Sequence, residues 1–255
     1  MQTNVNVWAI ADLHLSFGIP NKEMDVFGEN WVNWTEKIAA NWRSSVHPDD
    51  LVLIAGDISW AMKPENALPD LKWIDQLPGT KLIIRGNHDY WWSSKRQVEN
   101  VLPPSIRLIQ NNAFHWKHFS IGGARLWDTP DYHFEGYIEV KGDRQERDLI
   151  EYEKDEGKME KIFQRELNRL EMSLKLLDPA ADCRIAMCHY PPLSADLSDS
   201  RASALLEKYH VNICVFGHLH NVKKEIAPLF GEKNGIAYFL TSCDYLNFKP
   251  LNLFS

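Results

Sequence analysis

The sequence has little positive charge, no long apolar run and no paired-cysteine motif, and each absence excludes a class of protein. Lys and Arg number 28 against 35 Asp and Glu, which gives a net charge of −7. A protein that grips long nucleic acid through a general basic surface is therefore excluded, because such binding depends on many cationic side chains. We expect no stable binding of nucleic acid, whereas a small anionic substrate remains open.

The apolar runs are too short for a membrane span, which needs about 20 predominantly apolar residues. The amino-terminal stretch has no basic region before it, and Asp12 interrupts it early. It therefore matches neither a signal peptide nor a transmembrane segment. We expect no membrane insertion and a cytoplasmic location.

The four cysteines show no Cys-x-x-Cys spacing, and all lie in or beside apolar runs typical of strands. This placement favours buried, reduced thiols over a disulfide or a zinc site. The four positions are Cys183, Cys188, Cys214 and Cys243.

What is present is typical of a globular protein with a sizeable core: 255 residues, of which 44% are hydrophobic and 25% charged. No internal repeat, low-complexity tract or strong domain boundary divides the chain. We therefore predict one domain over residues 1–255.

Strand-like runs alternate with helical patterns along the first hundred residues. Continuous apolar runs, as found in strands covered on both faces, occupy 5–11, 51–55 and 81–85. Residues 64–76 follow a helical pattern with Pro69 expected in the first turn, and Ser93 or Ser94 is expected to cap a helix to about Val101. The alternation predicts β-α-β units and an α/β fold.

The second half begins with a β-rich stretch at 106–127, in which Gly122 and Gly123 are predicted to form the turn. Charged residues dominate 128–157, which we interpret as an exposed insertion or lid. A long amphipathic helix is predicted from Met159 onward. Three further strands are predicted at 184–188, 211–216 and 236–240.

Five short blocks of metal-ligand residue types are spread along the chain, and four of them close an apolar run. The blocks are Asp12-Leu13-His14, Gly56-Asp57, Gly86-Asn87-His88-Asp89, Cys188-His189 and Gly217-His218-Leu219-His220. A parallel or mixed sheet collects the ends of separate strands at one edge, so distant ligands can converge there. We therefore predict that the blocks form a single site.

Taken together and in order, the blocks resemble the signature D-x-H, G-D, G-N-H-D/E, H and G-H-x-H of the calcineurin-like metallophosphoesterase superfamily. The matching positions run from Asp12 to His220, most of the chain. The resemblance implies one domain of this family over 1–255, built as a four-layer α-β-β-α sandwich. Two mixed β-sheets would be flanked by helices, with the metal site at the strand ends and 128–157 as an insertion or lid.

The resemblance also implies a binuclear metal centre, in which a shared anionic ligand offsets the repulsion between the two cations. The implied ligands are Asp12, His14 and His220 for one ion, Asn87, His189 and His218 for the other, and Asp57 shared by both. Mixed nitrogen and oxygen donors suit Mn, Fe, Zn or Ni rather than Ca. We expect two divalent or trivalent transition-metal ions, with Mn or Fe favoured.

The activity implied by the resemblance is that of a metal-dependent phosphoric ester hydrolase. A metal-bound hydroxide would attack phosphorus in line while both cations neutralise the phosphoryl oxygens. By the same resemblance His88 is not a ligand but the general acid for the leaving oxygen, and Asp89 would orient its ring.

Three further side chains are candidates for contact with the substrate. Arg125 could donate two hydrogen bonds to a phosphate, although an ordinary surface ion pair is an equal alternative. Trp60 and Trp91 follow metal loops closely and could stack on a nucleobase or sugar, although core packing is the simpler interpretation.

The leading hypothesis is hydrolysis of a small phosphomonoester or phosphodiester. One alternative is a catalytically weak or inactive metal-binding scaffold for protein partners. A second is a nucleotide-sugar-lipid pyrophosphohydrolase, because the opening at Asp12 and His14 is similar to that of the UDP-diacylglucosamine pyrophosphohydrolases. The segment from Gly56 to Trp60 departs from the acidic, aromatic continuation of that group. The sequence leaves the oligomeric state open.

Overall fold

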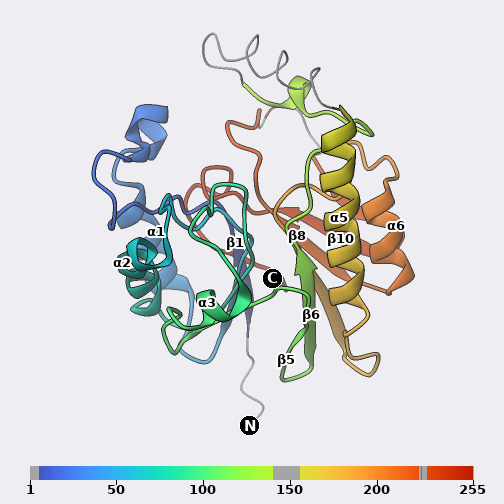
Figure 1. Ribbon diagram of the computed structural model, residues 1–255, viewed down its shortest axis with the longest axis horizontal. Helices are drawn as coiled ribbons and strands as arrows, with labels where there is room; N and C mark the ends of the chain where they lie inside the picture. Colours follow the sequence, from blue (N-terminus) through green and yellow to red (C-terminus); the bar gives the residue numbers. More distant parts are fainter. Residues whose placement is uncertain (1–5, 140–155, 224, 226–228, 255) are drawn as a thin grey trace.

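The structure is a computed structural model that describes residues 6–139, 156–223, 225 and 229–254. The described chain forms two β-sheets packed face to face, with helices on both outer faces (Figure 1). The amino-terminal half supplies most of the first sheet and its helices, the carboxyl-terminal strand β11 completes that sheet, and the segments in between form the second sheet and its helices. These four layers confirm the predicted α-β-β-α sandwich.

The first sheet has the strand order β11-β1-β2-β3-β4. Strands β1 to β4 are parallel and β11 is antiparallel to β1, so the sheet is mixed. The carboxyl ends of β1, β2 and β3 therefore meet at one edge. The strands are β1 (Val7–Ile10), β2 (Leu51–Ile54), β3 (Thr80–Ile83), β4 (Ile106–Leu108) and β11 (Leu251–Asn252).

The second sheet has the order β5-β6-β7-β8-β10-β9 and is also mixed. Its four central strands are parallel, whereas β5 and β9 pair antiparallel at the edges. The strands are β5 (Phe114–Trp116), β6 (Phe119–Ala124), β7 (Cys183–Cys188), β8 (Ile213–Phe216), β9 (Gly231–Lys233) and β10 (Ile236–Leu240).

Helices α1 and α2 flank the molecule on one side and α5 and α6 on the other (Figure 1). Ser94 caps α3 as predicted, in a reciprocal pair of hydrogen bonds with Gln97, and Ser200 caps α6 in the same manner with Ser203. The helices are α1 (Trp34–Ser45), α2 (Pro64–Asp75), α3 (Lys95–Glu99), α5 (Glu156–Leu174) and α6 (Arg201–Lys208), with short 3-10 helices η1 (Met24–Phe27), η2 (Glu29–Trp31) and η3 (Glu135–Tyr137).

Successive residues of the strands bury their side chains in different layers. Ala9 of β1 and Ile185 of β7 belong to the apolar cluster between the sheets. Ile10 points to the outer face, where it shares a cluster with Trp42 of α1. Residues of α5 and α6 cover the outer face of the second sheet in a third cluster. Because both faces of the central strands are buried, their sequences read as continuous apolar runs.

Two local predictions are wrong. Gly122 and Gly123 lie inside β6 rather than in a turn, and the chain instead reverses near Lys117, whose φ is 53°. The absence of a side chain at Gly122 leaves room for Ser173 of α5, and the backbone N–H of Gly123 donates to Oγ of the same serine at 2.8 Å. Helix α2 begins at Pro64, where a proline is well tolerated, and Pro69 lies inside the helix.

The predicted insertion at 128–157 falls largely outside the described residues, which omit 140–155. Its described part contains η3 and an isolated bridge between Ile138 and Val222. Helix α5 begins within the last residues of the predicted insertion. All four cysteines are free thiols, and three of them are buried, as predicted.

Candidate metal centre

The backbone at the strand ends is strained where the predicted ligands lie. Asp12, His14, Asp57 and His218 have φ values of 60°, 46°, 51° and 73°. This left-handed region is costly for residues other than glycine and is concentrated at functional sites. Gly86 supplies the space, because a Cβ there would collide with Oδ1 of Asp57. The glycines of the blocks thus allow neighbouring ligand loops to meet.

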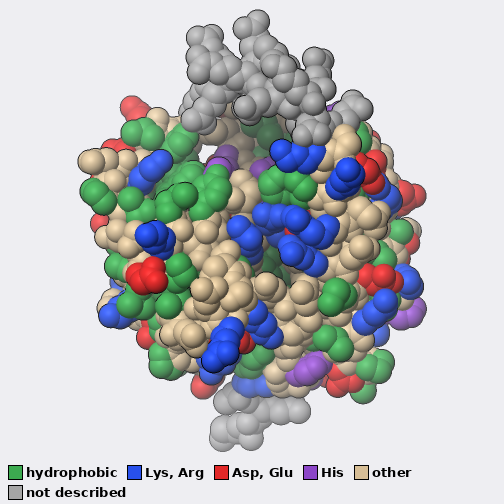
Figure 2. All heavy atoms as spheres, viewed as in Figure 1, with side chains coloured by type: hydrophobic (Ala, Val, Ile, Leu, Met, Phe, Trp, Pro, Cys, Tyr) green, Lys and Arg blue, Asp and Glu red, His purple; other side chains and the backbone are tan. Residues whose placement is uncertain are grey.

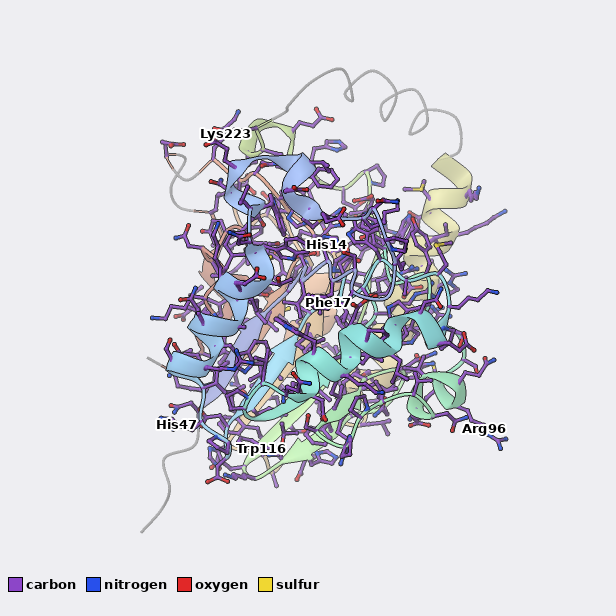
Figure 3. All side chains as sticks on the ribbon, turned by 90° about the vertical axis from the view of Figure 1, so that its left-hand side faces the viewer. His14, Phe17, His47, Arg96, Trp116 and Lys223 are labelled. Carbon is purple, nitrogen blue, oxygen red and sulfur yellow. The ribbon has the colours of Figure 1, made fainter. Side chains whose placement is uncertain are left out.

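One group of donor atoms consists of Asp12, His14 and His220, from the ends of β1 and β8. Nε2 of His14 lies 3.1 Å from Nε2 of His220, and Nε2 of His220 lies 3.8 Å from Oδ1 of Asp12. One donor atom from each residue lies within 4.8 Å of the others, close enough to share one cation. Figure 3 shows His14 inside the molecule near the upper ends of the strands, whereas His47 lies at the opposite end.

The second predicted set converges on the amide of Asn87. Its Oδ1 lies 2.6 Å from Nε2 of His189 and 3.1 Å from Nδ1 of His218. These residues follow β3, β7 and β8, so strands of both sheets contribute to one side of the site. The structure therefore brings together both ligand sets predicted from the sequence.

Asp57 lies between the two sets. Its Oδ2 is 3.8 Å from Nε2 of His14 and 3.4 Å from Nε2 of His189, while its Oδ1 accepts the backbone N–H of His88 at 2.8 Å. Asp12 also approaches His189, but only at Nδ1, 3.9 Å away, and that nitrogen is 2.9 Å from the carbonyl oxygen of Ala55. Asp57 is therefore the better placed of the two carboxylates to serve both sets.

Hydrogen bonding to the histidine rings shows that the donor set fits cations. The carbonyl of Ala55 can only accept, so Nδ1 of His189 carries a hydrogen and Nε2 of the neutral ring is an acceptor. That acceptor faces Oδ2 of Asp57, and the Nε2 atoms of His14 and His220 face each other. Such pairs repel unless a proton or a metal ion lies between them. Imidazole and carboxylate donors in this arrangement suit transition metals.

The carboxylates oppose the effect of burial on the histidines. Burial by itself lowers the pKa of His189, but the charge and hydrogen bonding of Asp57 together with the charge of Asp12 outweigh it and raise that pKa to about 9. Burial dominates at His14 and lowers its pKa to about 3. The field that retains a proton on His189 would equally favour a metal ion, so metal binding at neutral pH must displace that proton.

Asp244 completes the site, although the sequence analysis did not select it. Its Oδ1 lies 2.9 Å from Nδ1 of His220, and its Oδ2 accepts the backbone N–H of Asn221 at 3.0 Å. The carboxylate therefore holds Nε2 of His220 toward Asp12 and His14. The signal was present: Asp244 follows β10 just as the predicted ligands follow their strands.

Truncating Asp244 to Ala is expected to weaken metal affinity by about 10- to 100-fold, because the ring of His220 loses the carboxylate that orients it. Asp244→Asn, whose amide oxygen can still accept from Nδ1, should show a smaller loss. Competition with a chromophoric chelator measures both affinities. If Asp244→Ala bound the metal as tightly as the wild type, His220 would need no orienting partner.

The structure does not bear out the expected contact between Asp89 and the ring of His88. Nδ1 of His88 is buried and has no hydrogen-bond partner among the described residues. The Asp89 carboxylate is occupied by four N–H groups that tie the second and third blocks together. The donors are the backbone N–H groups of Ile58, Ser59 and Gly86 and the Nε1–H of Trp91. Asp89 thus positions the loops and does not orient His88.

The three candidate substrate contacts differ in position. Trp60 is half-buried and stacks on His14, with ring centroids 4.9 Å apart, so it lies beside the site. Trp91 is fully buried, which agrees with the simpler interpretation of core packing and not with stacking on a substrate. Arg125 is mostly buried and pairs with Glu166 at 3.1 Å, which is not the ordinary surface ion pair weighed above.

The family model for calcineurin-like phosphoesterases matches residues 5–222. The chain therefore belongs to the calcineurin-like phosphoesterase family, as the order of its five blocks predicted. Members of this family are phosphoesterases, and they generally bind two transition-metal ions.

Two curated relatives are the Gene 66 proteins of Mycobacterium phages L5 and D29, 34% identical over 86 and 84 residues. Each match takes in 33% of this chain and 40% of the relative, so the chain spans less than half the length of these relatives. Among solved structures, the chain is similar to the phosphopantetheinyl hydrolase PptH of Mycobacterium tuberculosis. The TM-score is 0.53 at 15% identity, over 98% of this chain and 95% of that one, which shows the fold alone. No helix of the described residues is long and apolar enough to cross a membrane.

Proposed function

We propose that this chain hydrolyses a small phosphomonoester or phosphodiester at a binuclear metal centre. The observation that carries the proposal is the place of Asp57, whose Oδ2 faces Nε2 of His14 on one side and Nε2 of His189 on the other. A carboxylate oxygen between two sets of metal ligands can serve two cations at once.

Asp12, His14 and His220 would hold one ion, and Asn87, His189 and His218 the other, with Asp57 shared. Mn and Fe are the ions we favour, because imidazole nitrogens and carboxylate oxygens are mixed in both sets. When bound, the two ions would supply a nucleophilic water at neutral pH and neutralise the charge that develops on the phosphoryl oxygens. The chain's own contribution is to place the ligands before the substrate arrives.

His88 would donate the proton that the leaving oxygen needs. The buried Nδ1 has no acceptor among the described residues, so we assign the donation to Nε2 of the protonated ring, which is left neutral when the proton has moved to the leaving oxygen. Burial lowers the pKa of His88, with the charge of Asp57 opposing it. The ring is held between aromatic neighbours, with its centroid 4.5 Å from that of Trp60 and 6.1 Å from that of Tyr90. It is therefore fixed in place without a hydrogen bond to the ring.

The test is hydrolysis of p-nitrophenyl phosphate and bis(p-nitrophenyl) phosphate by protein stripped with a chelator and reloaded with Mn²⁺. We expect two metal ions per chain by elemental analysis and turnover of at least one ester only after reloading. His47→Gln changes a histidine at the end of the molecule opposite His14. It serves as the control for the loss of a histidine outside the site and should behave as wild type.

Two results would contradict the proposal. If each chain bound a single ion at saturation, the proposal of a binuclear centre would be wrong. Two bound ions without turnover of either ester would instead favour the scaffold alternative, which needs the metal ligands only for structure.

A further inference from the structure

Three arginines pair with one buried carboxylate beside the metal loops, and a fourth lines the cavity next to it. We refer to Arg85, Arg125, Arg165 and Arg169 as the arginine cluster. Oε1 of Glu166 lies 3.1 Å from Arg125, 3.4 Å from Arg165 and 2.7 Å from Arg169. Arg85 lines the same cavity as Arg125, Glu166 and Arg169. The cavity is lined by Arg85, Arg125, Arg169 and Glu166, which leaves a local surplus of two positive charges in a chain whose net charge is −7.

The cluster contains buried donors that nothing in the described chain satisfies. Nε of Arg85 and Nε of Arg125 are both buried without a hydrogen-bond partner among the described residues. Buried polar atoms in proteins are nearly always paired, and an unpaired one costs free energy unless a water or an ion completes it. Two unpaired N–H groups beside a surplus of positive charge call for an anion.

The surplus is also larger than a structural ion pair requires. Glu166 is 1% exposed, and one guanidinium would suffice to neutralise it. Arg125 is additionally held over the ring of Trp127, 4.4 Å from its centroid, which fixes its direction. The guanidinium groups beyond the first repel one another, and an oxyanion with several acceptor oxygens would offset that repulsion.

The cavity and the metal centre are built from neighbouring positions of the backbone. Arg85 directly precedes Gly86 and Asn87, and the carbonyl oxygen of Arg125 accepts the backbone N–H of His189 at 3.1 Å. Figure 2 shows Lys and Arg side chains gathered at the centre of this face, below the point where histidine side chains reach the surface. The cavity volume is about 110 Å³, more than one water molecule needs.

We propose that the cavity lined by Arg85, Arg125 and Arg169 binds a second phosphate group of the substrate while the first lies at the metal centre. The substrate class is then a phosphoester that carries two phosphoryl groups. This inference rests on the proposed function, because it takes the reacting phosphate to lie at the metal centre.

The test uses matched pairs of substrates that differ in one phosphate: alkyl monophosphates and α,ω-alkanediol bisphosphates of increasing chain length. For the Mn²⁺-loaded enzyme, kcat/KM should be higher for a bisphosphate of one preferred length than for its monophosphate. Arg85→Gln should lower this ratio by about 10- to 100-fold, the size of one charge-assisted hydrogen bond. Arg169→Gln, whose side chain is 40% exposed, is a second variant that should act in the same direction.

Arg165→Gln is the control, because Arg165 contacts Glu166 but does not line the cavity. Sulfate provides an independent measurement: it should inhibit the bisphosphate reaction more strongly than the monophosphate reaction, and Arg85→Gln should remove the difference. Equal kcat/KM for both members of every pair, or equal inhibition of both by sulfate, would overturn this inference and leave the proposed function intact. Absence of turnover with every ester would instead overturn the proposed function.

Discussion

Asp57→Asn is expected to lose at least one of the two metal ions and to reduce kcat by about a thousandfold or more. The shared position needs an anion, because a neutral amide cannot offset the repulsion of two cations. The substitution keeps the shape of the side chain and an oxygen that can accept the N–H of His88, now at 2.8 Å. The fold should therefore survive. Elemental analysis and steady-state kinetics on the same preparation measure the two effects together.

Asp49→Asn is the matched control, since it removes the same charge from an exposed turn outside the site. It should bind two ions and retain full activity. If Asp57→Asn bound both ions as tightly as the wild type, Asp57 would not be the shared ligand. Asp12, the other carboxylate near both sets, would then be the candidate.

His88→Gln is expected to keep both metal ions and to lower kcat for an alkyl phosphate by about 100- to 10,000-fold, the contribution of a positioned general acid. The ring supplies none of the proposed ligand atoms, and the contact of His88 with Asp57 is made by its backbone N–H. Metal content and the far-ultraviolet circular dichroism spectrum should therefore match the wild type.

The leaving group separates proton donation from a merely structural role. p-Nitrophenolate departs without help, so p-nitrophenyl phosphate should lose little activity in His88→Gln. An alkyl phosphate, whose alkoxide must be protonated, should lose most of it. An equal loss with both substrates would mean that His88 positions the substrate or the loops instead.

Strand-end chemistry accounts for most of the site that could be predicted. Asp12, Asp57 and Asn87 follow parallel neighbours β1, β2 and β3, and parallel pairing alone brings their ends to one edge. Asp244 obeys the same rule after β10, but it stands outside the family signature and was overlooked. The rule was more general than the motif used to apply it.

Local sequence does not decide which partner a side chain meets. Asp89 and His88 are adjacent in sequence, yet the carboxylate turns to backbone N–H groups of the preceding metal loop. Trp91 follows a metal loop as closely as Trp60 does, but it is fully buried whereas Trp60 is half-buried beside His14. Sequence distance does not distinguish these cases, because the direction of a side chain depends on the packing of other segments.

The arginine cluster shows the same limit on a larger scale. Arg85 and Arg125 follow strands of different sheets, and Arg169 lies on α5. No local sequence pattern therefore predicts that they share a cavity. Arg125 alone was a candidate from the sequence. The buried Glu166 that collects three of the arginines was not selected, because a glutamate within a charged helix is ordinarily solvated.

The strands, the sheet edge at which they end and the metal-ligand residues gathered there could all be predicted from the sequence. These follow from local patterns: continuous apolar runs, glycines that allow close approach, and polar residues beyond each strand. The distances from Asp57 to both sets, the contact of Asp244 with His220 and the cavity shared by the arginines became known from the three-dimensional structure. Those relations depend on how the two sheets pack against each other, which brings together residues that no local pattern connects.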